Sequence, residues 1–341
     1  MNLEVSWEAL AGHANEVREL KTLLAEGRLP HALLFTGRDG IGKKLAGQIL
    51  AAAILCGHDN APCGVCDNCR AMRLGSHPDY YELLPEVRGK STRIIRIEAI
   101  REMQTAVSRS AVQAGRRVVL IDDADTMNEP AANSLLKTLE EPDGQVTFIL
   151  IARDRSSLLD TIVSRCMPLA FGALSPAELL QELGKRQLDP EAAGKLALLA
   201  DGSLGQALKL SQHGGLDLRD DALQFLLALP QLNMGRIWEE AAVKGEMERE
   251  RLAEWVMYFN MFLRDMLLLY DDGASQLIYN ADVREKLVQI LPMFSPGTLF
   301  AMVQQTRELQ HRLQANVNLR LQLEGFFIRL KDCHQGQINR Y

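Results

Sequence analysis

The stretch Gly37-Arg-Asp-Gly-Ile-Gly-Lys43-Lys44 decides the fold that the rest of the chain must adopt. An apolar run, 31–36, precedes it, and an alanine- and leucine-rich segment, 45–55, follows it. A strand, a glycine-rich turn and a helix in this order form the context that a phosphate-binding loop requires. The sequence therefore predicts a nucleotide-binding loop at the start of a helix.

The chemistry expected of this loop depends on three glycines and two lysines, Gly37, Gly40, Gly42, Lys43 and Lys44. The glycines let backbone N–H groups converge on an anion at a helix N-terminus, and Lys43 would reach the terminal phosphates. The next position calls for Ser or Thr, whose hydroxyl ligates Mg²⁺, but this chain has Lys44. An ammonium repels a dication. We therefore expect a loop shaped for ATP with poor support for catalytic Mg²⁺.

Composition limits the class of protein. A chain of 341 residues, 47% apolar and 24% charged, is typical of a globular protein of two or three domains. There is no run of 18 apolar residues and the N-terminus lacks a signal-peptide layout, so we expect a cytoplasmic protein without a membrane span. The net charge of −6 argues against broad, charge-driven nucleic-acid binding.

Further apolar runs predict a sheet around the loop. The expected strands are 31–36, 80–84, 117–122 and 146–151. Helices are expected at about 97–113 and 131–141, and a polar loop at 86–92. Strands that alternate with helices predict a three-layer α/β domain with a parallel sheet, which we place at 1–170 with a cysteine-rich insert at 56–69.

Beyond residue 170 the pattern becomes helical throughout. Ser175 and Glu178 have the spacing of a capping box and begin a small helical unit, 171–212. That unit has only roughly 40 residues, too few for much core of its own. Residues 213–341 are again helical and predict a third, all-helical domain.

Four clustered cysteines, Cys56-x6-Cys63-x2-Cys66-x2-Cys69, have the spacing of a zinc site. Four such ligands can close tetrahedrally on one Zn²⁺ and leave no open position for catalysis, so we expect structural zinc. His58 could replace Cys56 as the fourth ligand. A thiol–disulfide redox pair is the rival interpretation, but that motif would open a helix after a strand.

The run 118–125 ends in Asp122 and Asp123, where a nucleotide-hydrolysing enzyme carries two acids. The first acid holds Mg²⁺ through water, and the second, usually Glu, orients the attacking water. Asp123 is one methylene shorter than Glu, and both acids could instead be solvated at a strand end. Arg165, in the run 162–166, could reach a neighbouring subunit's γ-phosphate as an arginine finger, although a lone arginine more often faces solvent.

Together these motifs resemble the bacterial clamp-loader AAA+ subunits of DNA polymerase III. The resemblance is carried by residues 37–43, Asp122-Asp123, 131–142, Ser164-Arg165-Cys166, the cysteine insert and 315–324. The run 135–142 and the Ser-Arg-Cys triplet are specific to clamp loaders. The resemblance implies an AAA+ domain, a helical lid and a collar that holds a five-subunit ring. It also implies delta and gamma/tau subunits as partners, and a β sliding clamp loaded onto primed DNA.

Four departures separate the motor and non-motor members of that family. Lys44 replaces the magnesium hydroxyl, Asp123 replaces the catalytic Glu, Gly205 replaces the lid arginine, and Arg153 stands near the expected polar sensor. Arg165 is retained. The chain therefore is most similar to delta-prime subunits, which would give an arginine finger in trans without hydrolysing ATP. An active gamma/tau-type motor is the alternative, and a zinc-ribbon nucleic-acid-binding module is a weaker one.

Overall fold

The computed structural model describes residues 4–88, 92–108, 111–141, 144–212, 215–271, 277–313 and 318–335. Pro142 and residues 315–317, which carry part of the family resemblance, lie outside the described residues. The chain divides into two compact units. The first comprises Met1–Arg88, Thr92–Ala193 and Ala200–Gln206, and the second comprises Gly89–Ser91, Gly194–Leu199 and Ala207–Tyr341.

A five-stranded parallel sheet forms the centre of the first unit. Its strands, in spatial order, are β2 (Tyr80–Leu83), β5 (Arg117–Ile121), β6 (Val146–Ala152), β1 (Ala32–Thr36) and β7 (Met167–Ala170). Every residue of β5 is buried, as expected for a parallel strand covered by helices on both faces. The parallel α/β sheet that the sequence predicts is confirmed.

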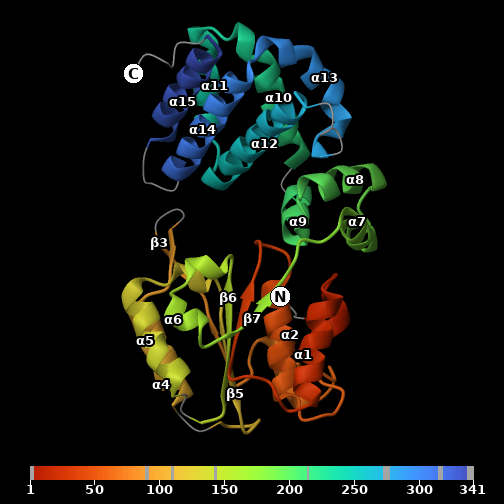
Figure 1. The fold of residues 1–341 in the computed structure, drawn as a ribbon, viewed down its shortest axis with the longest axis vertical. Helices are drawn as coiled ribbons and strands as arrows, with labels where there is room; N and C mark the ends of the chain where they lie inside the picture. The colour runs from red at the N-terminus through yellow and green to blue at the C-terminus, as the bar shows by residue number, and fades with distance from the viewer. Residues whose placement is uncertain are drawn as a thin grey trace. The chain divides into compact units, whose positions relative to one another are not determined.

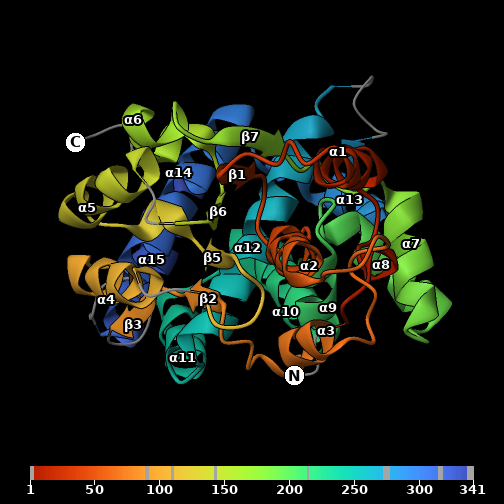
Figure 2. The ribbon, with the colours of Figure 1, turned by 90° about the horizontal axis from the view of Figure 1, so that it is seen from below.

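Helices cover the two faces of this sheet, as Figures 1 and 2 both show. One face carries α1 (Ala14–Ala25) and α2 (Lys43–Leu55), and the other carries α4 (Ile97–Val107), α5 (Glu129–Glu140) and α6 (Asp160–Val163). Side chains alternate along each strand, so Leu33 packs in the core on the α2 face and Leu34 in the core on the α4 and α5 face. The short α3 (Asp67–Leu74) begins at the end of the cysteine insert.

Three local predictions differ from the structure. The helix expected over 97–113 ends at Val107, and the backbone N–H groups of 112–114 donate to the carboxylate of Asp79 and not to helix carbonyls. The segment 86–92, expected to be a polar loop, includes β3 (Glu86–Arg88) and the first residue of β4 (Thr92–Ile94), and these two strands pair antiparallel. The sequence pattern did not predict β7.

Three helices follow the sheet: α7 (Pro176–Lys185), α8 (Pro190–Leu199) and α9 (Leu204–Gln212). The capping box at the start of α7 is present, with the Ser175 and Glu178 side chains each bonded to the other's backbone N–H. Residues 200–206, which include the beginning of α9, belong to the first compact unit. They therefore take part in the surroundings of the phosphate loop.

The second unit is helical in its described residues. Its helices are α10 (Gly215–Ala228), α11 (Met234–Gly245), α12 (Arg249–Leu268), α13 (Arg284–Ile290), α14 (Pro296–Leu313) and α15 (Leu319–His334). An aromatic cluster of Phe225, Trp255, Phe259 and Phe327 joins α10, α12 and α15. Among the described helices none alone is long and apolar enough to cross a membrane, and one bent pair, 281–293 with 296–310, meets that test by length and composition only.

Candidate functional site

The carboxyl edge of the sheet gathers the residues expected to bind nucleotide. The phosphate loop follows β1, Asp122 follows β5, and Arg153 follows β6. Thr36 pairs with Ala152 at this edge, and parallel strands end on the same side of a sheet. The structure therefore brings the loop, Asp122 and Asp123 together, as the sequence predicts.

The ammonium of Lys43 contacts backbone carbonyl oxygens of the phosphate loop itself. Lys43 is the first residue of α2 and only 6% exposed. Its ammonium donates to the backbone oxygen of Arg38 at 2.7 Å and also to that of Gly37. Burial lowers the pKa of Lys43, and the opposing influence of nearby carboxylates, Asp39 first, does not cancel it. The side chain expected to hold phosphate thus satisfies loop carbonyls instead.

A segment from the start of α9 packs directly on this loop. The Ser203 hydroxyl donates to the backbone oxygen of Asp39 at 2.8 Å, and the N–H of Gly205 donates to the backbone oxygen of Gly40 at 2.8 Å. A Cβ placed on Gly205 would lie 2.8 Å from the Cα of Gly40. The position where motor subunits would carry an arginine therefore tolerates only glycine in this arrangement.

The two acids of the predicted magnesium site are bound to cations of this chain. The Nζ of Lys44 lies 3.2 Å from Asp122 and 2.7 Å from Glu82. The Nη1 of Arg93 lies 2.6 Å from Asp123, whose pKa is raised by burial and then by the neighbouring Asp122. These residues do not fit a magnesium ion, because an ammonium stands against the carboxylate that would hold it.

Arg165 lies elsewhere. It follows α6 and precedes β7, whose Met167 pairs with Leu33 near the amino end of β1, whereas the phosphate loop follows the carboxyl end of β1. The guanidinium donates to the backbone oxygen of Thr161 at 2.8 Å and pairs with Glu140 at the end of α5. The structure therefore does not bring Arg165 to the loop of its own chain.

The cysteine insert forms a compact cluster of metal-ligand atoms. One such atom from each of Cys56, His58, Cys63 and Cys66 lies within 4.8 Å of the others, so these four could hold a metal ion. The Sγ of Cys69 lies 3.9 Å from that of Cys63. Cys69, which the sequence predicts as a ligand, is not one of these four, whereas His58, which the sequence offers as an alternative to Cys56, joins Cys56 in the cluster.

The electrostatics of this cluster favour a thiolate at Cys63. Backbone N–H groups of Val65 and then Cys66 lower the pKa of Cys63 to about 6, whereas burial raises the pKa of Cys69. Thiolate is the form of cysteine that binds metal. Cys63 therefore offers a charged ligand at neutral pH before any ion arrives.

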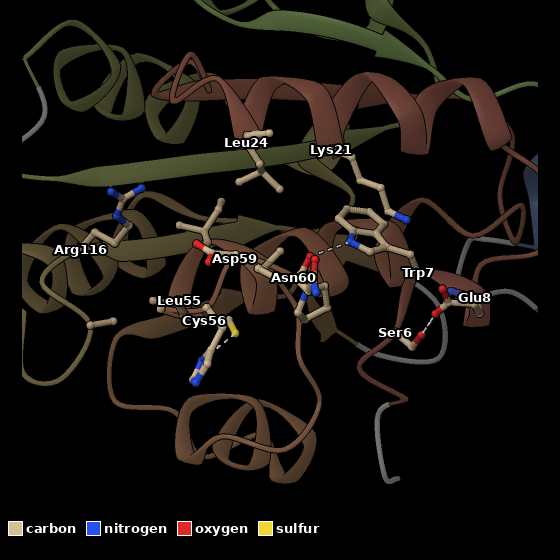
Figure 3. A pocket seen from close by; sticks show the side chains of 18 residues that line it. Ser6, Trp7, Glu8, Lys21, Leu24, Leu55, Cys56, Asp59, Asn60 and Arg116 are labelled. Carbon is tan, nitrogen blue, oxygen red and sulfur yellow. Dashed lines mark hydrogen bonds between the residues drawn. The ribbon is translucent and has the colours of Figure 1, made fainter.

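A cavity of about 890 Å³ lies beside this cluster, between α1, the end of α2 and the insert. Figure 3 shows Lys21 and Arg116 on opposite sides of the cavity. The indole N–H of Trp7 donates a hydrogen bond to the backbone oxygen of Ala61 in the insert. Cys56 contributes to the wall, but no glycine of the phosphate loop does. The cavity therefore is distinct from the predicted nucleotide site.

The fold and the site define a nucleotide-binding-type α/β domain with a cysteine-rich insert. A family model described as DNA polymerase III, delta subunit, matches residues 12–175, and one described as its C-terminal part matches 219–332. The DNA polymerase III subunit delta-prime of Pseudomonas aeruginosa is 33% identical over 87% of this chain and 90% of its own length. The chain belongs to the DNA polymerase III delta-prime family.

Two other relatives differ in how much of their own length this chain matches. The delta-prime subunit of Bacillus subtilis is 29% identical over 97% of this chain and all of its own length. The tau subunit of Escherichia coli is 32% identical over 69% of this chain but only 40% of its own length. The matches to these two delta-prime subunits therefore cover most of both chains, whereas the match to this tau subunit covers less than half of the tau chain.

Sequence reasoning missed four residues that shape these sites: Glu82, Arg93, Glu140 and Ser203. Glu82 lies in the predicted strand 80–84, but its proximity to Asp122 follows from the pairing of β2 with β5, which periodicity does not reveal. Arg93 lies in β4, just after the segment 86–92 that was expected to be a loop. Glu140 and Ser203 had a signal, since Glu140 belongs to the clamp-loader run 135–142 and Ser203 to the helix-capping sequence 201–203.

Proposed function

We propose that this chain acts as a delta-prime subunit that supports the ATPase of its neighbours without hydrolysing ATP itself. It would assemble with delta and gamma/tau subunits in the cytoplasm and help to load the β sliding clamp onto primed DNA. The AAA+ domain at 1–170, the lid at 171–212 and the collar at 213–341 are the domains that this role implies. Arg165 would complete the ATP site of an adjacent gamma/tau subunit.

One observation carries the proposal: the groups that would bind ATP and Mg²⁺ are bound to other parts of the chain. Lys43 contacts loop carbonyls, Lys44 contacts Asp122, and Arg93 contacts Asp123. A catalytic Mg²⁺ would first have to displace the ammonium of Lys44. Asp123 would have to break its ion pair with Arg93 before it could orient a water. These contacts argue against the alternative of an active gamma/tau-type motor.

The position of Arg165 supports an action in trans. Its side chain is one-third exposed and lies at the end of the strands opposite to its own phosphate loop. Glu140 and Thr161 hold the guanidinium at the surface, where a neighbouring subunit could approach it. An arginine finger is worth on the order of 10³-fold or more in rate at the site it completes.

Replacing Arg165 with Ala tests this role in a complex reconstituted from delta, gamma/tau and this chain. We expect assembly to be unchanged. The rate of ATP hydrolysis at one site should fall on the order of 10³-fold, and clamp loading should fall with it. Arg155→Ala, which removes an exposed arginine that follows the carboxyl end of β6, at the other end of the strands, is the control. Unchanged ATPase and loading in the Arg165 variant would refute the trans-acting role. Steady ATP hydrolysis by the isolated chain, abolished by Lys43→Ala, would favour the motor.

We also propose that the cysteine cluster holds one structural Zn²⁺. Metal analysis of the purified chain should give close to one zinc per chain, because the cluster offers at least four thiol and imidazole ligands. Cys66→Ser should lose most of that metal, and Cys166→Ser, outside the cluster, should retain it. A wild-type stoichiometry near zero would rule the zinc site out.

A further inference from the structure

We propose that the ammonium of Lys44 is a built-in replacement for a divalent cation, held by Asp122 and Glu82. The chain would then supply its own counter-ion to a site that would otherwise take Mg²⁺. This inference rests on the assignment of 37–44 and Asp122 to a former nucleotide site, which is part of the proposed function. It is independent of whether Arg165 acts in trans.

Two carboxylates from adjacent strands converge on this one cation. Asp122 follows β5, and Glu82 lies in β2, where it pairs with Leu120 of β5. The Nζ of Lys44 lies 2.7 Å from Glu82 Oε1 and 3.2 Å from Asp122 Oδ2. Carboxylate oxygens from two chain segments are the ligands that a hard dication takes in proteins. The ammonium therefore lies where such an ion would find its oxygen ligands.

Neighbouring side chains hold Glu82 in this orientation. Its second oxygen accepts a hydrogen bond from the Tyr80 hydroxyl at 3.0 Å and lies 3.3 Å from the side-chain amide of Gln48. Gln48 is four residues after Lys44 on α2, so both side chains leave the same face of the helix. Glu82 is thus fixed by the protein, as metal-binding carboxylates usually are.

Burial explains why a cation is needed here. The Asp122 and Glu82 side chains are only 15% and 23% exposed, whereas that of Lys44 is 40% exposed. Two partly buried carboxylates side by side repel one another unless a positive charge lies between them. Burial by itself would lower the pKa of Lys44, but its contacts with Glu82 and Asp122 raise it, so the ammonium stays charged.

Removal of the ammonium should open the site to a metal ion. The test uses the full chain as wild type, Lys44→Thr, Lys44→Met and the double variant Lys44→Thr/Asp122→Asn. Binding of Mn²⁺ is followed by electron paramagnetic resonance, and Tm is measured with and without MgCl₂. Lys44→Thr supplies a hydroxyl in place of the charge, whereas Lys44→Met keeps a long, unbranched side chain but removes the charged ammonium.

We expect Lys44→Thr to bind one Mn²⁺ about tenfold or more tightly than wild type, and the double variant to lose the gain. Mg²⁺ should raise the Tm of Lys44→Met and Lys44→Thr but not that of wild type. Equal Mn²⁺ binding by wild type and Lys44→Thr, or no gain in either Lys44 variant, would overturn the inference. Because metal binding is measured on the isolated chain, its failure is distinguishable from failure of the Arg165 test in the complex.

Discussion

At the scale of single residues, two adjacent lysines perform different tasks because successive helix positions point in different directions. Lys43 turns back to the carbonyl oxygens of the phosphate loop, and burial lowers its pKa. Lys44, one position on, reaches Asp122 and Glu82. The sequence alone showed that Lys44 could not ligate a metal. Its actual partners required knowledge of which strand lies beside β5.

Asp79 provides a prediction at the same scale. Its fully buried carboxylate accepts hydrogen bonds from the backbone N–H groups of Val112, Gln113 and Ala114, at 2.7 to 2.8 Å. Burial raises the pKa of Asp79, but the three donors outweigh it, so the net pKa lies below the ordinary value. A carboxyl group whose folded pKa is depressed stabilises the fold above its unfolded pKa, and the contribution is lost as pH falls through the folded pKa.

We therefore expect Asp79→Asn to lower the free energy of unfolding at pH 7 by about 2 kcal/mol, the typical worth of a hydrogen bond to a charged group. The difference from wild type should begin to shrink below about pH 4, where this carboxyl group becomes protonated in the unfolded chain, and it should vanish once the pH is below the lowered folded pKa. Urea unfolding at pH 7 and pH 3 measures both values. Asp67→Asn, at an exposed aspartate, is the control, and an equal loss at the two pH values would contradict the argument.

At the scale of elements, the sequence predicted the strands that consist of continuous apolar runs and missed short strands that lack such a run. In the predicted strand 117–122, residues 118–121 are all apolar, and β5 forms there. By contrast, β7 has four residues and contains Pro168, which cannot donate to a sheet and so appears on edge strands. β7 does lie at the edge, paired with β1 alone. Its place is set by tertiary pairing, which single-sequence periodicity cannot detect.

The contact between the start of α9 and the phosphate loop gives a prediction about an element. In Gly205→Ala the new Cβ would meet backbone atoms of Gly40 at 2.8 and 3.0 Å, so one of the two segments must move. We expect a loss of about 1–3 kcal/mol in the free energy of unfolding. Gly194→Ala is the matched control, because nothing lies within 4 Å of its Cβ position in α8. If both variants unfold alike, the close contact is not a constraint.

At the scale of the whole molecule, the chain contains two compact units, each with its own apolar core. We expect unfolding to occur in more than one step, as is usual for multidomain chains. Leu120→Ala in β5 should lower the stability of the first unit, and Phe259→Ala in α12 that of the second, by about 3–5 kcal/mol each. Calorimetry should show each variant shifting a different transition. A single transition, shifted equally by both, would show that the units unfold together.

The helix α2 links the two distinctive parts of the first unit. Its first turn carries Lys43 and Lys44, and Cys56, which caps its other end, belongs to the metal-ligand cluster. With 13 residues it is about 20 Å long. The helix is therefore held at both ends: at its start by the contacts of Lys43 and Lys44, and at its end by Cys56 of the cysteine cluster. Loss of the cysteine cluster's contacts leaves those of Lys43 and Lys44 in place. We therefore expect α2 to unwind from its C-terminal end at Leu55, while the phosphate loop keeps its conformation.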